Sequence, residues 1–397
     1  MADNNENKVL NVPPLRFPEF TEEWKAEQLD NIATLSKGIG ISKEQLSEDG
    51  EPCILYGELY TKYKSEIIKQ VESKTDINGS KLKRSKANDV IIPCSGETAV
   101  DIATARCVPF DNILFGGDLN VISLHQYDGA FMSYQLNGKR KYDIARVAQG
   151  VSIVHLYGEH LKAIKTYNPT LPEQQKIAKL LSLLDDRIDT QNKIIEDLKK
   201  LKSAIIEIEY SPKDSYHSHI GGAIVQISKR NKDNHLCNVL SVSNRQGFIK
   251  QSEQFEDRNV ASDDTSNYKI VEKNDFAYNP ARINVGSIAR LTKFETGIVS
   301  PMYICFRTKD CLLPEYLELF FESRNFFYHI QKRLEGSVRL CLSYEELCNI
   351  PIVIPSIEKQ KQVDLHLSKL AQKIDLEMKI LQFVQQQKTY LLHQMFI

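Results

Sequence analysis

The sequence predicts an α+β protein in which two similar globular domains are joined by two long helices that form an antiparallel coiled coil. Three observations predict this fold: a long internal repeat, a heptad pattern in each copy of it, and short apolar strands separated by turns. The repeat begins at Pro169, Leu171, Gln174 and Ile177, which recur 186 positions later as Pro355, Ile357, Gln360 and Val363. A period this long indicates two tandem halves of one chain.

Each copy of the repeat opens a heptad seam, in which apolar residues step alternately by four and by three. The seam positions are Ile177, Leu181, Leu184, Ile188, Ile195 and Leu198 in the first copy, and Val363, Leu367, Leu370, Ile374, Leu381 and Val384 in the second. One polar residue interrupts each seam, Gln191 in the first and Glu377 in the second. This spacing is typical of a helix with a narrow apolar stripe, because a strand has a period of two.

The two seams are expected to pack against each other. Thr170 and Ser356 are suited to cap the helices, and Ser211-Pro212 ends the first one after about Ile208. About 37 helical residues give a rod of roughly 55 Å, which would overhang a domain of about 150 residues. The alternative is that each helix packs only on its own globular half.

The remaining chain divides around these helices. We expect a disordered polar tail over 1–12, a first domain over 13–169, a helix over 170–209, a linker over 210–222, a second domain over 223–354 and a helix over 355–397. Apolar runs predict strands at 90–92, 113–115, 121–123 and 153–154, and at 276–278, 287–289 and 302–306. Helical patterns lie at 130–136 and 314–334.

Composition favours a protein of the cytoplasm. The chain has 397 residues, 42% of them hydrophobic and 26% charged, and no run of eighteen apolar residues that would span a membrane. Its N-terminus lacks the apolar core of a signal peptide. The eight cysteines are scattered without C-x-x-C spacing, which argues against a zinc ribbon or redox motif. His217 and His219 alternate, but no cluster completes a site, so no metal is expected.

The charge distribution leaves two interpretations open. A net charge of −1 argues against a nucleic-acid binder, although the local distribution matters more than the sum. Basic residues gather in 81–86 and 139–141, and loop residues 94–98 differ from 280–284 at the repeat offset. These clusters are either phosphate-binding loops of two modules with different targets, or solvated surface beside drifting loops.

Enzymatic signatures are missing from the sequence. It contains no G-x-x-x-x-G-K phosphate loop and no G-x-S-x-G nucleophile turn. Tyr278-Asn279-Pro280 matches the start of an adenine methyltransferase tetrapeptide, but Ala281 replaces the aromatic residue that would stack on a flipped base. The absence of these motifs indicates a protein that recognises and organises other molecules rather than a catalyst.

Two motifs carry a family resemblance. The first is Pro14-Leu15-Arg16-Phe17-Pro18-Glu19-Phe20 with Trp24 and Leu29, and the second is Leu171-Pro172-Glu173-Gln174-Gln175-Lys176-Ile177-Ala178 running into Leu184-Asp185-Asp186-Arg187-Ile188. With them, the chain resembles the DNA specificity (S) subunits of type I restriction-modification systems over nearly its whole length. The second copy departs from the motif, with Glu358-Lys359-Gln360-Lys361-Gln362, but keeps the helical pattern.

The resemblance implies a fold, partners and a role. It implies two target-recognition domains that each read half of a split double-stranded DNA site, and a helical spacer that sets their separation. It also implies docking of two methyltransferase (M) subunits, which bind S-adenosylmethionine and methylate adenine, and of restriction (R) subunits, which use ATP and Mg²⁺. The S subunit itself would have no active site, cofactor or metal.

Charge and loop divergence, rather than any family motif, select the candidate DNA contacts. Phosphate contacts are expected from Lys81, Lys83, Arg84, Lys86, Lys139, Arg140 and Lys141, and base contacts from Ser95, Glu97 and Thr98. In the second domain the candidates are Asn279, Arg282, Asn284, Arg290, Arg333 and Arg339. Two alternatives remain: a coiled-coil interaction scaffold that reads no DNA, and a self-contained methyltransferase or nuclease.

Overall fold

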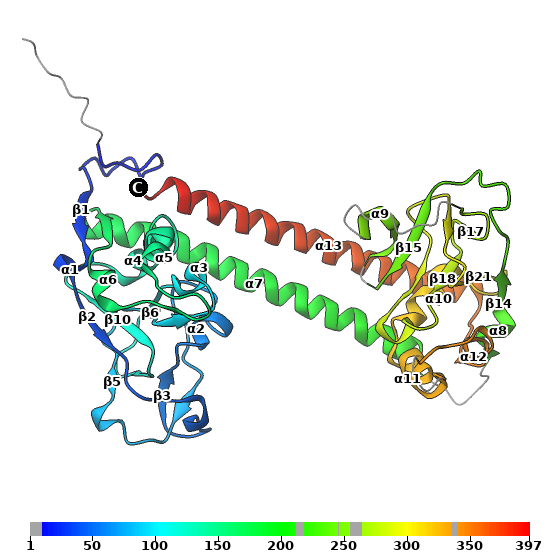
Figure 1. The fold of residues 1–397 in the computed structure, drawn as a ribbon, viewed down its shortest axis with the longest axis horizontal. Coiled ribbons are helices and arrows are strands. Elements are labelled where there is room, and N and C mark those ends of the chain that lie inside the picture. The colour runs from blue at the N-terminus through cyan, green and yellow to red at the C-terminus, as the bar shows by residue number, and fades with distance from the viewer. Residues whose placement is uncertain (1–9, 212–217, 245, 255–263, 336–339) are drawn as a thin grey trace, which may run out of the picture. The chain divides into compact units, whose positions relative to one another are not determined.

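The computed structural model describes residues 10–211, 218–244, 246–254, 264–335 and 340–397 (Figure 1). The chain divides into two compact units. The first comprises Met1–Asn192 together with Lys379–Ile397, and the second comprises Lys193–Met378. Because the cuts fall within the two long helices, each unit contains part of both.

The first unit is built on two four-stranded sheets. One has the order β2 (Ala33–Lys37), β10 (Leu119–Leu124), β6 (Asp89–Pro93), β8 (Arg106–Val108), and the other β4 (Lys74–Thr75), β3 (Glu51–Ile54), β9 (Leu114–Phe115), β5 (Lys83–Arg84). Two further pairs are β1 (Lys25–Gln28) with β12 (Lys165–Asn168), and β7 (Ser95–Gly96) with β11 (Val154–His155). The helices are α1 (Leu29–Ile32), α2 (Glu58–Thr61), α3 (Ala99–Ile102), α4 (Gly129–Asn137), α5 (Lys141–Val147) and α6 (Gly158–Lys162), and two 3-10 turns lie at Lys43–Gln45 and Gly79–Lys81.

The central strands of this unit are apolar on both faces. Val90 and Ile92 of β6 lie in one core cluster, whereas Ile91 lies in another on the opposite face. Side chains alternate along a strand, so a strand between two cores reads as a continuous apolar run. The runs at 90–92 and 121–123 therefore gave correct strand predictions.

The second unit repeats this arrangement. Its sheets have the orders β14 (Ile224–Ile227), β21 (Ile304–Thr308), β18 (Phe276–Tyr278), β19 (Ile288–Arg290), and β16 (Gly247–Lys250), β15 (Val239–Ser243), β20 (Thr296–Val299), β17 (Lys269–Glu272), with a small pair β13 (Ser218–His219) and β22 (Pro351–Ile352). In both units the second sheet contains one parallel pair, β3 with β9 and β15 with β20. The helices are α8 (Ile220–Ala223), α9 (Gln251–Gln254), α10 (Pro314–Phe321), α11 (Arg324–Arg333) and α12 (Tyr344–Cys348), with a 3-10 turn at Ile283–Val285.

One turn shows the repeat at the level of atoms. Asn88 and Asn274 precede β6 and β18, and both have positive φ, 81° and 71°. Asparagine tolerates this left-handed conformation better than most residues. The next residue closes the turn in both units, because Asp89 accepts the Lys86 backbone N–H at 2.9 Å and Asp275 accepts that of Glu272 at 2.7 Å.

The two long helices are α7 (Leu171–Glu209) and α13 (Ile357–Gln394). In the first unit Ile177, Leu181 and Leu184 of α7 share a core with Val384 of α13. Trp24 and α4 contribute to the same core, so helix pairing and packing on the globular part occur together. In the second unit Lys359 of α13 forms an ion pair with Glu209 of α7 at 3.1 Å. Within each unit the start of one helix thus lies beside the end of the other, which is the predicted antiparallel pairing.

The seam positions follow the heptad spacing. The buried ones are Ile177, Leu181, Leu184, Ile195, Val363, Leu367, Ile374 and Val384, and the partly buried ones are Ile188, Leu198, Leu370 and Leu381. The polar interruptions Gln191 and Glu377 are also buried. The predicted α+β fold with two tandem units and paired long helices is confirmed.

The stretch 314–334, expected to hold one or two helices, contains two, because Ser323 caps a new one by accepting the Phe326 N–H at 3.2 Å. Two local predictions were wrong. Residues 10–12, expected to be disordered, belong to the described structure, and Asn11 accepts the Trp24 backbone N–H at 2.9 Å; residues 1–9 of the expected tail lie outside the described part. Residues 218–222 of the expected linker form β13 and the start of α8.

Candidate nucleic-acid interface

The loop that follows β6 carries the residues expected to approach bases. Its β7 segment, Ser95–Gly96, pairs with β11, which fixes the loop at the end of the central sheet. Thr98 caps α3: its hydroxyl accepts the Asp101 N–H at 3.1 Å and donates to the Asp101 carboxylate at 2.6 Å. Because this hydroxyl is engaged within the chain, the structure supports a base contact for Ser95 and Glu97 better than for Thr98.

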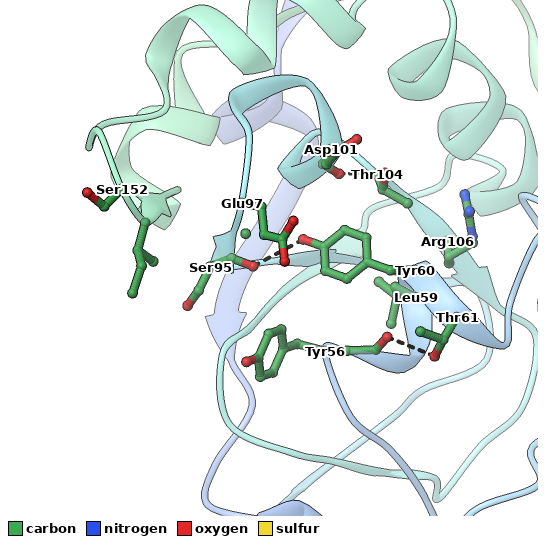
Figure 2. Close-up of a pocket in the computed structure, with 13 residues that line it drawn as sticks. Tyr56, Leu59, Tyr60, Thr61, Ser95, Glu97, Asp101, Thr104, Arg106 and Ser152 are labelled. Carbon is green, nitrogen blue, oxygen red and sulfur yellow. Dashed lines mark hydrogen bonds between the residues drawn. The ribbon is translucent and has the colours of Figure 1, made fainter. Parts of the chain in front are cut away.

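Ser95 and Glu97 line a cavity of about 740 Å³ in the first unit. Figure 2 shows the Glu97 side chain extending toward the Tyr60 ring, with Tyr56 and Ser152 at the edges. Tyr56 and Tyr60 are partly exposed. The cavity therefore combines aromatic surface with two carboxylates, Glu97 and Asp101, a combination suited to a flat ligand that offers N–H groups.

Three of the six hydroxyl groups that line the cavity already donate to the protein backbone. Tyr60 donates to the Ser95 carbonyl at 3.0 Å, Thr61 to the Gly57 carbonyl at 3.1 Å and Thr104 to the Asp101 carbonyl at 2.7 Å. Burial raises the pKa of Tyr60 far above its ordinary value, and the charge of Asp101 adds to this, so the phenol keeps its proton. These groups present lone pairs rather than hydrogens to the cavity.

Two donors of Arg106, which also lines the cavity, are bound to the protein backbone. The Nε–H of Arg106 donates to the Tyr63 carbonyl at 2.8 Å and its Nη1 to the Ala105 carbonyl at 2.9 Å. Burial lowers the pKa of Arg106, while nearby Glu66 and Asp185 oppose that change. Arg106 thus stabilises the backbone beneath the site through Nε and Nη1.

A basic and aromatic surface lies beside the cavity, and sequence reasoning missed it. The Lys37 ammonium lies 5.7 Å from the centre of the Tyr157 ring, and the His155 ring stacks on Tyr157 at 6.3 Å. Tyr157 and Ile153 are exposed. Such side chains can contact bases and phosphates together. Lys37 is isolated in the sequence, so only the fold joins it to Tyr157.

The first basic cluster contains both free and occupied cations. Lys81 and Lys86 are exposed and Lys83 is half-buried, and none of the three side chains has a partner among the described residues. Arg84 instead binds Glu51 through two hydrogen bonds, at 2.6 and 2.9 Å. The lysines have no partner within the described residues that would compete with phosphate, whereas Arg84 is paired with Glu51.

Arg140 of the second cluster also has a structural role. Its Nη2 donates to the Ile397 carbonyl at 3.0 Å, it pairs with Asp143 at 3.2 Å, and it lies 5.4 Å from the Tyr167 ring centre. With its side chain 17% exposed, Arg140 anchors the end of α13 and presents little to a ligand. Its neighbours Lys139 and Lys141 are half-buried and have no partner in the described part.

Two arginines of the second unit are likewise occupied. Arg290 binds the carboxylates of Glu315 and Glu318, the latter at 2.9 Å, and its side chain is 12% exposed. Burial raises the pKa of Glu318, and the Arg290 charge opposes that rise. Arg333 donates to the Asn349 carbonyl at 3.3 Å and pairs with Glu346 at 3.7 Å. The structure therefore does not present either group as a free phosphate ligand.

The remaining candidates of the second unit lie around a 3-10 turn. Asn279 accepts the Ala281 N–H at 3.1 Å, which shapes the turn. Arg282 is exposed and Asn284 half-buried, and neither side chain has a partner among the described residues. Arg339 lies outside the described residues.

A basic loop after β14 is a further feature that sequence reasoning missed. Lys229, Arg230 and Lys232 line a shallow hollow of about 660 Å³, and Arg230 donates to Asn267 at 3.1 Å. The signal was present, since Ser228-Lys229 follows its strand much as Ser36-Lys37 ends β2. Each unit thus has a lysine at or just after the end of its corresponding edge strand, Lys37 in β2 and Lys229 two residues beyond β14.

The described residues contain neither a metal-binding cluster nor a membrane-spanning helix. No group of three His, Cys, Asp or Glu side chains there is arranged to hold a metal ion. Among the helices described, none is both long and apolar enough to cross a membrane.

Comparison with known proteins identifies relatives of the chain. Residues 21–200 match the sequence model of the type I restriction modification DNA specificity domain. A curated relative, the type I restriction enzyme MjaVIII specificity subunit of Methanocaldococcus jannaschii, is 27% identical over 202 residues, which are 49% of this chain and 42% of the relative. The match thus spans less than half of that relative.

Solved structures share the fold along nearly the whole chain. The S subunit of a type I restriction-modification system from M. genitalium matches with a TM-score of 0.60 and 17% identity, over 97% of this chain and 99% of that one. A chain from a structure on complex assembly and conformational transition of the type I R-M system matches with a TM-score of 0.56 and 13% identity, over 96% and 98%. At these identities the likeness concerns the fold.

Proposed function

We propose that this chain belongs to the type I restriction-modification DNA specificity family and is the DNA-reading subunit of a type I complex. Each unit would read one half of a split double-stranded DNA target. The observation that carries this proposal is that the second unit repeats the sheet orders of the first, which holds most of the matched domain. A split DNA target requires two recognition domains, and the two units share one sheet arrangement.

Differences between the units support separate targets. The framework is shared, including the Asn-Asp turn before β6 and β18. The loops on it differ: residues 94–98 include a free carboxylate beside a cavity, whereas 280–284 form a turn with the exposed Arg282. Sequence is read by donors and acceptors at base edges, so different loops on one scaffold select different bases.

Phosphate binding would come from the free cations. These are Lys37, Lys81, Lys83, Lys86, Lys139 and Lys141 in the first unit and Lys229, Lys232, Arg282 in the second. Because the net charge is −1, we expect the chain alone to bind DNA weakly and its partners to supply further phosphate contacts.

The outer faces of the long helices would dock partner subunits. In the first unit Leu183 of α7 is 50% exposed and Phe383 of α13 is 72% exposed, and in the second unit Leu201 and Leu376 are 49% and 51% exposed. Apolar side chains outside the seam favour a protein interface. We assign this face to two methyltransferase subunits, with restriction subunits joining the same complex in the cytoplasm.

The chain would contribute recognition and no catalysis. S-adenosylmethionine, ATP and Mg²⁺ would be bound by the partner subunits, and adenine methylation would occur there. The long helices, which continue from one unit into the other, would set the separation of the two half-sites.

Selection from random duplexes tests this proposal. The chain is mixed with its methyltransferase subunits, bound duplexes are recovered and sequenced, and the chain alone serves as the comparison. We expect one enriched split motif with a fixed spacer, and weak binding without the partners. Tight assembly with the partners but no enriched motif would favour a scaffold that reads no DNA.

A further inference from the structure

The Glu97 carboxylate is a free hydrogen-bond acceptor at the cavity of the first unit. We propose that Glu97 reads a cytosine in the half-site bound by this unit, by accepting an N–H from the cytosine N4 amino group. This inference rests on the proposed function and names one residue that determines specificity.

The surroundings of Glu97 leave its carboxylate uncommitted. Glu97 is exposed, and no hydrogen bond or ion pair to it exists among the described residues. The hydroxyls of Tyr60 and Thr104, which line the same cavity, donate to backbone carbonyls. A ligand can therefore supply the donor for Glu97 without displacing a hydrogen bond within the protein.

The two carboxylates of the cavity disfavour a phosphate ligand there. Glu97 and Asp101 both line it against the single positive charge of Arg106, whose Nε and Nη1 are bound to the carbonyls of Tyr63 and Ala105. Like charges repel, so the DNA backbone would avoid the cavity and follow the lysines instead. A base edge with an amino group is the part of DNA that a carboxylate attracts.

Cytosine fits this acceptor better than the other bases in the major groove. Guanine presents two acceptors, N7 and O6, and thymine presents O4 beside a methyl group. Adenine offers an N6 amino group, but its N7 lone pair lies next to it and repels a carboxylate. Cytosine presents N4–H without an adjacent acceptor, which is why Glu and Asp pair with it.

The second unit has no carboxylate at the position equivalent to Glu97. At the repeat offset Glu97 corresponds to Ile283, which is 1% exposed in the core. A change at Glu97 should therefore alter one base pair in one half-site and leave the other half-site unchanged. This asymmetry provides an internal control.

The experiment uses selection from random duplexes by the complex of this chain with its methyltransferase subunits. Four versions are compared: wild type, Glu97→Gln, Glu97→Ala and the matched control Glu48→Gln, whose exposed carboxylate lies outside the cavity. Thermal unfolding of each version verifies that the fold is intact. We expect wild type and Glu48→Gln to prefer a C·G pair at one position by about tenfold, the size of one good base contact.

The variants should differ at that position alone. Glu97→Gln should shift the preference toward adenine, because glutamine pairs with adenine N6 and N7, and Glu97→Ala should accept all four pairs about equally. Glu97 variants that keep the wild-type motif at every position would overturn the inference while leaving the proposed function standing. A wild-type complex that enriches no split motif would overturn both.

Discussion

Lys388, near the end of α13, donates to Asp185 of α7 at 2.6 Å within the first unit. The Tyr134 hydroxyl donates to the other oxygen of Asp185 at 2.6 Å, and Lys388 also pairs with Glu66 at 2.5 Å. One buried polar cluster therefore ties both long helices to the globular part. Such a cluster favours a single register over others that an apolar seam alone would permit.

The pH dependence of stability should report on Asp185. Burial raises the pKa of this carboxyl above its ordinary 3.8, although Lys388 opposes the rise. The folded protein therefore keeps the Asp185 proton to a higher pH than the unfolded chain does. Stability from this group falls as pH rises from about 4 to the raised value, and is constant outside that interval.

Asp185→Asn removes this titration. The free energy of unfolding of the variant, relative to wild type, should rise with pH across the interval and then level off. Urea denaturation at several pH values from 4 to 8 measures it. A difference that stays constant over the whole range would show that Asp185 titrates normally in the folded protein.

Substitutions of two adjacent leucines of α7, Leu183 and Leu184, should differ in their effect on the free energy of unfolding. Leu184 is 8% exposed in the core that joins α7 and α13, whereas Leu183 is 50% exposed. Leu184→Asp buries a charge without a partner and should lower the free energy of unfolding by more than about 3 kcal/mol. Leu183→Asp should change it by less than about 0.5 kcal/mol. Equal losses in denaturant titrations would refute the assigned seam.

Leu183→Asp should have its effect on assembly instead. If the outer face of α7 docks a methyltransferase subunit, a charge there weakens that interface about tenfold or more. Analytical ultracentrifugation with the partner subunits measures the change, and Glu196→Gln on the same helix is a polar control. Unchanged assembly would move the docking surface elsewhere.

Replacing a lysine without a partner and replacing an arginine with one should affect the salt dependence of DNA binding differently. Lys86→Ala should weaken binding to all DNA sequences and lower the slope of log affinity against log salt by about 0.9, because one phosphate contact is lost. Arg140→Ala should leave this slope unchanged, because its guanidinium binds Ile397 and Asp143. Filter binding by the assembled complex from 50 to 200 mM salt distinguishes them; equal slopes for Lys86→Ala and wild type would remove Lys86 from the interface.

Cysteine reactivity should follow burial. Burial raises the pKa of Cys53 and Cys94 to about 11 and that of Cys107 and Cys305 to about 12, so few thiolates form at pH 8. Cys237 and Cys311 are exposed. Iodoacetamide should label these two first, as read by peptide mass mapping, and their replacement by serine should abolish the rapid phase. Equally rapid labelling of Cys107 in folded protein would contradict the described core.

Sequence reasoning succeeded where periodicity is local. The heptad spacing located α7 and α13 closely because a helix seam repeats every few residues, and the apolar run Phe276–Tyr278 marked β18 at its observed bounds. The apolar pattern over 314–334 left one or two helices open, because a single cap, Ser323, divides an otherwise continuous pattern.

The candidate site was harder to predict because its contacts are long-range. In the sequence Arg84 lies in a cluster of cations without a nearby acidic residue, because its partner Glu51 is 33 residues away. The cavity at Glu97 includes Tyr56 and Tyr60 from α2 and its preceding turn, and Ser152 from the loop before β11. Residue type and local charge do not reveal which side chains the sheet brings together.

Methylome sequencing of cells with and without this gene, in the presence of the partner genes, tests the central claim most directly. The account predicts one split motif, methylated at adenine in cells that carry the gene and unmethylated in cells that lack it. Identical methylation in both strains, with the complex demonstrably assembled, would contradict the claim that this chain selects the DNA target.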